Sequence, residues 1–454
     1  MRRSNVWALC GAMVLAWPVT GLAKEAPAAH GTEQPGALGT EGQIGKEKLA
    51  LNLLASAPVR AEMARLEALY RNDAQGKTPA GAATIRRAVD SITLAAIQYV
   101  VNDDAARPVP LWVVNAPHSW SGIDVPRSGY GIDNPDNVYR NIPIDGASRY
   151  EIRGRIAAPG PVEQHFVLMD AIPGTTPITA EGGAFLGALR SDQMQIAADG
   201  SFVISVDSEP AGTRPNHIQT PTKGHFLMIV RDLFTDWGSQ NVIALDIKRV
   251  GGPVAPPPPT ESVLAQQAAD LLAKIGPYWV DYDNRFIFSK PANELTPPRH
   301  RPGGRGLSAS GHFRLADDEA LIMTLDPLGA TSLGVQVTDP WGVAYEYAAR
   351  TSSLNNVQAH KNADGTISYV IAIADPGVVN WLDPEGYGAG IYAVRWQGLP
   401  TGADATRAVR DVRLVKLKDL KAALPADTRY VTTAEREAQR TARAASHARR
   451  MAAP

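Results

Sequence analysis

Apolar residues near the start of the chain recur with the period of an α-helix. Between Val59 and Tyr70 they fall at positions i, i+4, i+7 and i+11, and the stretch from Ile85 to Tyr99 repeats this pattern. Such spacing places the side chains on one face of a helix. We therefore predict a helical segment over residues 46–104, packed as a layer on the main body.

From about residue 111 the pattern changes to an alternation of apolar and polar residues. The runs Tyr150–Ile156 and Ser201–Val206 show it, and glycine, proline, asparagine and aspartate separate such runs. Short alternating runs between turn residues are typical of strands in a sandwich or barrel. A second strand-rich stretch follows the proline run Pro256–Pro259 and a helix that Thr260 is expected to cap.

Three polar residues recur in the same order in both strand-rich regions: an aspartate at a predicted hairpin turn, an asparagine, and an arginine in an apolar strand. They are Asp199, Asn216 and Arg231 in the first region, and Asp364, Asn380 and Arg395 in the second. The separation from asparagine to arginine is the same in both, and the other separation differs by one residue. The pattern predicts two homologous β-sandwich units, residues 105–250 and 300–418, joined by a linker and helix at 251–299.

The two ends of the chain differ from this body. Basic residues, a short apolar run and small residues follow one another in residues 1–23, which is the pattern of a cleaved secretory signal peptide. Residues 24–45 are predicted to form a flexible leader, and 419–454 an Ala/Arg-rich tail, either a solvated helix or a frayed end. We therefore expect a periplasmic or secreted protein without a transmembrane anchor.

Composition excludes several classes of function. The formal net charge of −1 means that the chain has no excess of positive charge with which to bind nucleic acid. The only cysteine, Cys10, falls in the predicted signal peptide, so the mature chain has no disulfide, thiolate nucleophile or cysteine metal ligand. No phosphate loop, dinucleotide fingerprint or helical histidine pair is present, and we expect no cofactor and no metal.

Two stretches resemble a known family. The first is the run Asp133–Arg140, and the second combines Asp339–Gly342 with Asn380–Asp383. Together they are similar to the domain of unknown function 1214, which is related to the 1254 family. The resemblance covers about residues 105–420 as two tandem units, and it implies jelly-roll-like β-sandwich modules. With the helical layer and the linking helix, the fold class we expect is mainly β.

The run Asp133–Arg140 is the densest polar cluster, and it has three interpretations: a cup for a hard cation, ordinary turn chemistry, or a ligand pocket. In the pocket interpretation Asp136 or Tyr139 serves as general acid or base, and Arg140 holds an anionic group. The further residues predicted to bind the ligand are Tyr130, Asp133, Asn137, Arg350, Asn355, Asn380, Trp381 and Arg395.

These features predict an exported β-sandwich protein that binds a small organic or carbohydrate ligand. Such a protein is either a simple binding protein or a cofactor-independent hydrolase, lyase or isomerase, because functional side chains gather in the loops of a rigid scaffold. The alternative is a non-enzymatic binding or assembly protein of the bacterial envelope, favoured by the duplicated unit and the lack of a known catalytic motif. The sequence does not decide the oligomeric state, or whether the two units share one site.

Overall fold

The computed structural model describes residues 36–179, 185–301, 304 and 306–451. The predicted signal peptide and most of the predicted leader lie outside these residues. Helix and strand each account for 29% of the chain, so the expectation of a mainly β protein is corrected to a mixed α and β fold. The helical share comes mainly from the long helices that precede and follow the first β region in the sequence, together with the C-terminal helix.

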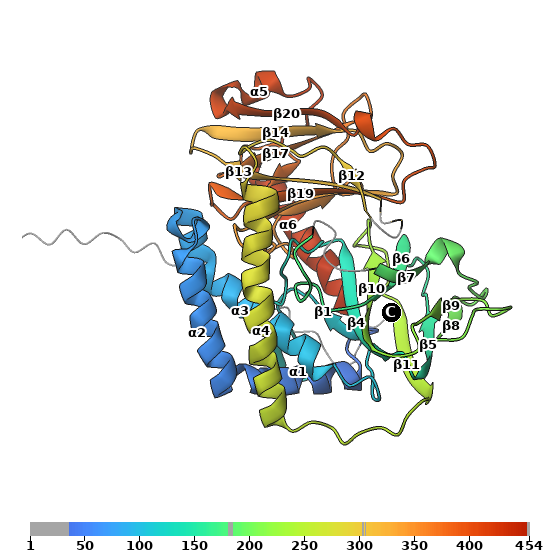
Figure 1. Cartoon of the computed structure of the whole chain (residues 1–454). Helices are drawn as coiled ribbons and strands as arrows, with labels where there is room; N and C mark the ends of the chain where they lie inside the picture. The colour runs from blue at the N-terminus through green and yellow to red at the C-terminus, as the bar shows by residue number, and fades with distance from the viewer. Residues whose placement is uncertain (1–35, 180–184, 302–303, 305, 452–454) are drawn as a thin grey trace, which may run out of the picture.

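Four long helices form a layer beside the strands (Figure 1). They are α1 (Glu41–Leu54), α2 (Ala57–Asn72), α3 (Pro79–Val101) and α4 (Glu261–Asp283). Thr40, Thr78 and Thr260 cap α1, α3 and α4 by accepting a hydrogen bond from a backbone N–H in the first turn. The residues of the predicted helical period, from Val59 to Tyr70 and from Ile85 to Tyr99, are buried in the core that this layer shares with the first β region. No helix of the described residues is long and apolar enough to cross a membrane.

The first β region consists of two sheets. A five-stranded sheet has the order β1-β4-β10-β6-β7, and a four-stranded sheet has the order β11-β5-β8-β9. Apolar side chains such as Ile142, Phe166 and Met228 fill the space between the sheets. The strands are β1 (Leu111–Val113), β4 (Asn137–Asp145), β5 (Arg149–Arg155), β6 (Glu163–Met169), β7 (Phe185–Arg190), β8 (Ser201–Asp207), β9 (His217–Gln219), β10 (His225–Leu233) and β11 (Ala244–Gly251), with β2 (His118–Trp120) and β3 (Ile123–Val125) forming a separate hairpin.

The second β region repeats this order. Its sheets are β12-β13-β19-β15-β16 and β18-β17-β14-β20, so that β4 to β11 correspond one by one to β13 to β20. The one parallel pair of each region also corresponds, β8 with β9 and β17 with β18. The strands are β12 (Arg299–His300), β13 (Leu307–Arg314), β14 (Glu319–Leu325), β15 (Ser332–Thr338), β16 (Ser353–Asn355), β17 (Ile367–Ala372), β18 (Trp381–Leu382), β19 (Ala389–Gln397) and β20 (Val409–Lys416).

Two of the three repeated polar residues have the same structural role in both regions. Asp199 and Asp364 each accept a hydrogen bond from the backbone N–H two residues later, which closes the turn before β8 or β17. The amides of Asn216 and Asn380 each bond both the N–H and the carbonyl of one residue in a neighbouring loop. The repeat seen in the sequence therefore corresponds to equivalent positions in the two regions.

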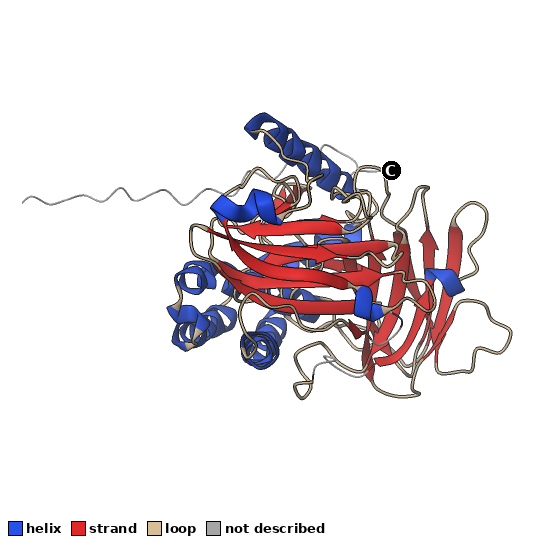
Figure 2. Ribbon diagram, turned by 90° about the horizontal axis from the view of Figure 1, so that it is seen from above, coloured by secondary structure: helices blue, strands red, loops and turns tan. Residues whose placement is uncertain are grey.

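The C-terminal segment is docked, contrary to the expectation of a solvated or frayed tail. After the short α5 (Leu420–Ala423), helix α6 (Thr433–Ala448) lies between the two β regions (Figure 1). Its Arg436, Arg443 and His447 are buried, and they hydrogen-bond or stack on residues of the body. Figure 2 shows the strands gathered in two groups, with helices around them.

Candidate ligand-binding site

Three candidate side chains lie in one row across the first five-stranded sheet. Arg231 of β10 pairs in register with Tyr139 of β4 on one side and with His165 of β6 on the other. Side chains alternate between the two faces of a strand. The neighbours Met228 and Val230 point into the sandwich, so Arg231 points outward, on the face that carries Ile229 and is covered by the helical layer and the second β region.

The corresponding row of the second region is made of smaller side chains around Arg395. Arg395 of β19 pairs with Ser308 of β13 and with Gly334 of β15, and Gly334 in turn pairs with Asn355. A Cβ at Gly334 would lie 2.7 Å from Oδ2 of Asp136, so the glycine makes room for a loop of the first region. The two regions thus meet through the outer faces of their five-stranded sheets.

Neither arginine of these rows has a carboxylate partner among the described residues. Nη1 of Arg395 donates to Oε1 of Gln336 at 2.5 Å, and its Nη2 donates to the carbonyl of Ile132. Arg231 lies over the ring of Tyr139 at 5.7 Å, and its Nη1 has no hydrogen-bond partner. Burial lowers the pKa of both guanidinium groups, and the charge of Arg395 lowers the pKa of Arg231 further. Both residues are partly exposed, and Asp133 and Asp136 place negative charge near Arg395, so a bound anion would offset the remaining cost of enclosing the two cations.

Polar groups of the loop before β4 border the two arginines. The Tyr139 hydroxyl accepts hydrogen bonds from the backbone N–H of Asn134 and from Nδ2 of Asn137, both at 3.1 Å. Asp133 is buried, and its Oδ1 has no hydrogen-bond partner. Burial raises the pKa of Asp133 to about 7, although the nearby Arg395 and Arg127 oppose the rise. Near neutral pH this carboxyl group therefore neutralises the arginines only in part.

His165 lies next to Arg231 in the row, and Glu163 lies two residues before it on the same face of β6. Nε2 of His165 lies 2.8 Å from Oε1 of Glu163, but neither ring nitrogen makes a hydrogen bond of good geometry. The histidine is only 3% exposed. Buried polar atoms are nearly always paired, so an imidazole left in this state is consistent with a site that receives another molecule.

The residues predicted from the sequence fall into two groups. Asp136 accepts hydrogen bonds from Trp237 Nε1 at 2.9 Å and from Asn355 Nδ2 at 2.8 Å, and so ties the two regions together. Tyr130 shares a hydrogen bond of 2.6 Å with Tyr99 beside the cluster. The structure brings together Asp133, Asp136, Asn137, Tyr139, Asn355 and Arg395, with Tyr130 at the edge.

The other four predicted residues lie elsewhere. Arg140 points into the first sandwich, where it pairs with Asp232 at 2.6 Å. Arg350 pairs with Asp383. Trp381 begins β18 of the four-stranded sheet in the second region, Asn380 lies in the turn before it, and the ring of Trp381 lies 5.3 Å from Arg436 of α6. The functional candidates that the sequence did not nominate are Arg231, His165 and Glu163. The alternation of side chains along β6 could have grouped two of them, because it places Glu163 and His165 on one face of the strand.

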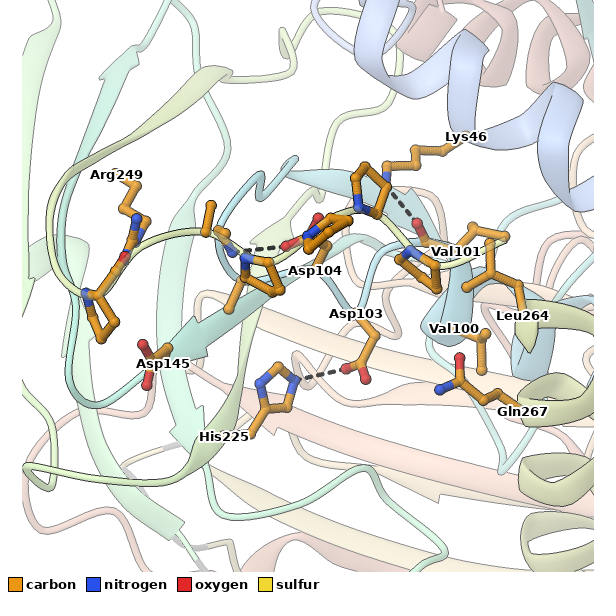
Figure 3. A pocket seen from close by; sticks show the side chains of 18 of the residues that line it. Lys46, Val100, Val101, Asp103, Asp104, Asp145, His225, Arg249, Leu264 and Gln267 are labelled. Carbon is orange, nitrogen blue, oxygen red and sulfur yellow. Dashed lines mark hydrogen bonds and ion pairs between the residues drawn. The ribbon is translucent and has the colours of Figure 1, made fainter. Parts of the chain in front are cut away.

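A cavity lies at the opposite end of the same strands (Figure 3). Its volume is about 430 Å³, and apolar residues and the proline run 256–259 form most of its wall. Nε2 of His225 lies 2.7 Å from Oδ1 of Asp103, and Nζ of Lys46 donates to the carbonyl of Val101 at 2.5 Å. Asp145, at the end of β4, lies six residues from Tyr139, or roughly 20 Å along the strand. The cationic groups in Figure 3 already have partners, so this cavity offers a ligand less electrostatic recognition than the arginine cluster.

Among the described residues, no group of three histidine, aspartate or glutamate side chains is placed to hold a metal ion. The geometry does not support a site for a hard cation at Asp133–Arg140, because the Asp136 carboxylate already accepts hydrogen bonds from Trp237 and Asn355. The arginines can instead bind an anion.

Residues 137–234 match the model of a protein family of unknown function, DUF1214. No functionally curated protein matches the chain. An uncharacterized protein from Burkholderia cenocepacia has the same fold, with a TM-score of 0.65 and 24% identity over 83% of this chain and 100% of its own. The VPA0106 protein from Vibrio parahaemolyticus is similar over 63% of this chain and 90% of its own, with 12% identity and a TM-score of 0.38, too low to support an argument.

Proposed function

We propose that this protein binds a small organic ligand that carries a carboxylate, in the space where the two five-stranded sheets meet. The observation that carries this proposal is the pair Arg231 and Arg395, two equivalent arginines of the repeat that form no ion pair with a carboxylate of the described residues. A guanidinium group binds a carboxylate through two parallel hydrogen bonds, which gives both affinity and orientation.

The surroundings favour an organic acid over an inorganic anion. Beside Arg231 lies the ring of Tyr139, and Oδ1 of Asn137, which has no partner among the described residues, is a polar group suited to a hydroxyl. Arg231, Tyr139 and Arg395 each keep part of their surface exposed, although Nη1 of Arg231 is buried. A uronic acid, which combines a sugar ring with a carboxylate, has this chemistry.

The first test compares carboxylates with neutral analogues in thermal-shift measurements. Galacturonate and glucuronate, as monomers and short 4-linked oligomers, are expected to raise the melting temperature, whereas galactose and glucose are not, because only a ligand that binds the native state stabilises it. The Arg231→Gln variant is expected to bind at least about tenfold more weakly, in line with the loss of a charged hydrogen bond.

Arg153→Gln is the matched control, since Arg153 is an exposed arginine of the same β region. Equal responses of both variants, or no response to any carboxylate, would contradict the proposal. The second result would favour a protein of the envelope that binds macromolecules and has no small-molecule site.

We also propose that the second β region is a diverged tandem copy of the first and belongs to the same family of jelly-roll-like modules. The shared strand order and the equivalent roles of Asp199 and Asp364, and of Asn216 and Asn380, support this proposal. Export to the periplasm or the medium is part of the same proposal, and it depends on the sequence of residues 1–23 alone.

A further inference from the structure

We propose that the cavity beside the proline run binds a second small molecule, which is neutral and mainly apolar and carries a hydroxyl or carbonyl group. An alcohol or ketone with an aromatic or terpenoid skeleton has this chemistry. The cavity lies at the other end of β4 and β10 from the arginine rows, so this inference does not depend on the proposed binding of a carboxylate.

The cavity has room for such a molecule and is open to it. Its volume is about 430 Å³, whereas a water molecule occupies about 30 Å³ in the liquid. Pockets for small molecules usually have volumes of about 300–1,000 Å³. Asp103, His225 and Gln267 line the cavity and are exposed, so a ligand can enter from solvent.

One wall of the cavity is apolar and belongs to the core of the helical layer. Val100 and Val101 end α3, Leu264 lies in the first turn of α4, and all three are part of this core (Figure 3). Leu49 of α1 packs against the same core and is partly exposed. A carbon skeleton placed against this wall would lose its contact with water, which favours binding.

The proline run forms another wall. Every residue from 252 to 260 is exposed, so this segment borders the cavity without packing into the core. Proline has no backbone N–H to donate. Two arginines hold the segment by its carbonyl groups instead, since Arg249 donates to Pro253 and Arg107 donates to Pro256. A run of four prolines is stiff, and it therefore keeps the cavity from closing.

The charged groups around the cavity favour a neutral ligand, because they are already paired. Nε2 of His225 is bonded to Asp103, and Arg107 forms an ion pair with Asp104. Asp145 accepts hydrogen bonds within its own turn. Three aspartates and three basic residues line the cavity, so its charge favours neither a cation nor an anion. An ionic ligand would give up its hydration here without gaining a counter-ion.

Two polar groups are left to bind an oxygen atom of the ligand. The bond from Nε2 of His225 to Asp103 leaves Nδ1 of the same ring for another partner. The amide of Gln267, in the second turn of α4, has no hydrogen-bond partner among the described residues (Figure 3). An amide both donates and accepts hydrogen bonds, so it suits a hydroxyl or a carbonyl oxygen. Apolar walls with a few such groups are typical of small-molecule sites.

The experiment measures binding of N-phenyl-1-naphthylamine to the full chain. This neutral fluorophore emits more strongly in apolar surroundings, and saturable binding at one site is expected. Cinnamyl alcohol is expected to displace it at a concentration at least about tenfold lower than cinnamate or cinnamylamine, which have the same skeleton but carry a charge. Galacturonate, the probe of the arginine rows, is expected not to displace it.

Two neighbouring residues of α4 give a matched comparison. Gln267→Trp fills part of the cavity, and we expect it to weaken binding at least about tenfold. Gln266→Trp makes the same change at an exposed position that does not line the cavity, and should leave binding unchanged. A variant in which glycine and serine alternate in place of Pro256–Pro259 is also expected to bind more weakly. The melting temperature of each variant without ligand shows that it is folded.

Several results would contradict the inference. Absence of saturable fluorescence would overturn the site, and equal binding by Gln267→Trp and Gln266→Trp would overturn its position. Displacement by the charged analogues as readily as by cinnamyl alcohol would overturn the class of ligand. None of these results affects the carboxylate proposal, which depends on Arg231 and Arg395. Failure of galacturonate to bind would overturn that proposal and leave this one intact.

Discussion

Neighbouring residues of β4 show how the face of a strand decides what a side chain can do. Tyr139 and Arg140 are adjacent in sequence, yet Tyr139 lies in the space between the two regions and Arg140 lies inside the first sandwich. Arg140 is only 1% exposed, and it donates to Asp232 Oδ2 and to the carbonyl of Ile243, both at 2.6 Å. The geometry gives Arg140 a structural role and leaves anion binding to Arg231.

Replacing Arg140 should therefore affect stability first. Arg140→Met leaves Asp232, whose pKa burial already raises, as an unpaired carboxylate inside the sandwich. We expect the free energy of unfolding to fall by about 3–5 kcal/mol, the range for breaking a buried ion pair. The double variant Arg140→Met/Asp232→Leu should recover most of this loss in urea denaturation. A single variant of normal stability that binds carboxylates poorly would instead give Arg140 the ligand-binding role first predicted for it.

A second buried acid makes stability depend on pH. Asp283, the last residue of α4, is 3% exposed, and its Oδ1 has no partner. Burial raises the pKa of Asp283 well above its usual range, and the charge of nearby Asp339 raises it further. The unfolded chain releases this proton at about pH 4, whereas the folded chain keeps it. The unfolded state thus binds fewer protons, and stability falls as pH rises from about 4 towards the folded pKa.

Asp283→Asn imitates the protonated acid and removes this dependence. We expect it to raise the free energy of unfolding at pH 8 by about 1–3 kcal/mol and to have little effect at pH 4. Urea denaturation at both pH values measures the difference. Asp281→Asn is the control, because Asp281 lies on the same helix in an exposed ion pair with Arg285. A loss of stability at pH 8 in Asp283→Asn would show that this carboxyl group is ionised and paired.

At the scale of elements, α6 and the turn that follows it connect the two β regions. The guanidinium groups of Arg443 and Arg450 lie over the Trp237 ring, each at 4.2 Å, and Trp237 belongs to the first region. Arg443 also donates to the Tyr347 carbonyl and to Ser353 Oγ of the second region, both at 2.7 Å. Cation–π contacts and buried hydrogen bonds therefore fix the regions on which the candidate site depends.

Two arginines of this segment allow a matched comparison. Arg443→Gln removes a buried cation from Trp237, Tyr347 and Ser353, and we expect it to lower the free energy of unfolding by about 2–4 kcal/mol. Arg449→Gln replaces an exposed arginine whose hydrogen bonds are long, at 3.4 and 3.5 Å. We expect it to change the free energy of unfolding by less than about 0.5 kcal/mol. Equal denaturation midpoints for the two variants would contradict this role of α6.

At the scale of the whole molecule, local sequence patterns predicted the helices and strands but not how α6 and the two β regions pack against one another. The helical period of residues 59–99, the strand alternation and the repeat through Arg231 and Arg395 depend on nearby residues, and their positions agree with the structure. The docking of α6 and the meeting of the two outer sheet faces depend on contacts between residues far apart in sequence, which no local pattern reports. His165 was missed for this reason, since segments distant in the sequence enclose it and leave it only 3% exposed.

The position of α6 at the end of the chain affects the order in which the protein can assemble. A ribosome makes both β regions before it makes the helix whose Arg443 joins them. During synthesis each sandwich can form its own core, because the strands of each lie within one continuous stretch of sequence. The two rows around Arg231 and Arg395 are fixed against each other only afterwards. The growing chain therefore holds folded modules for a time before the two arginine rows meet.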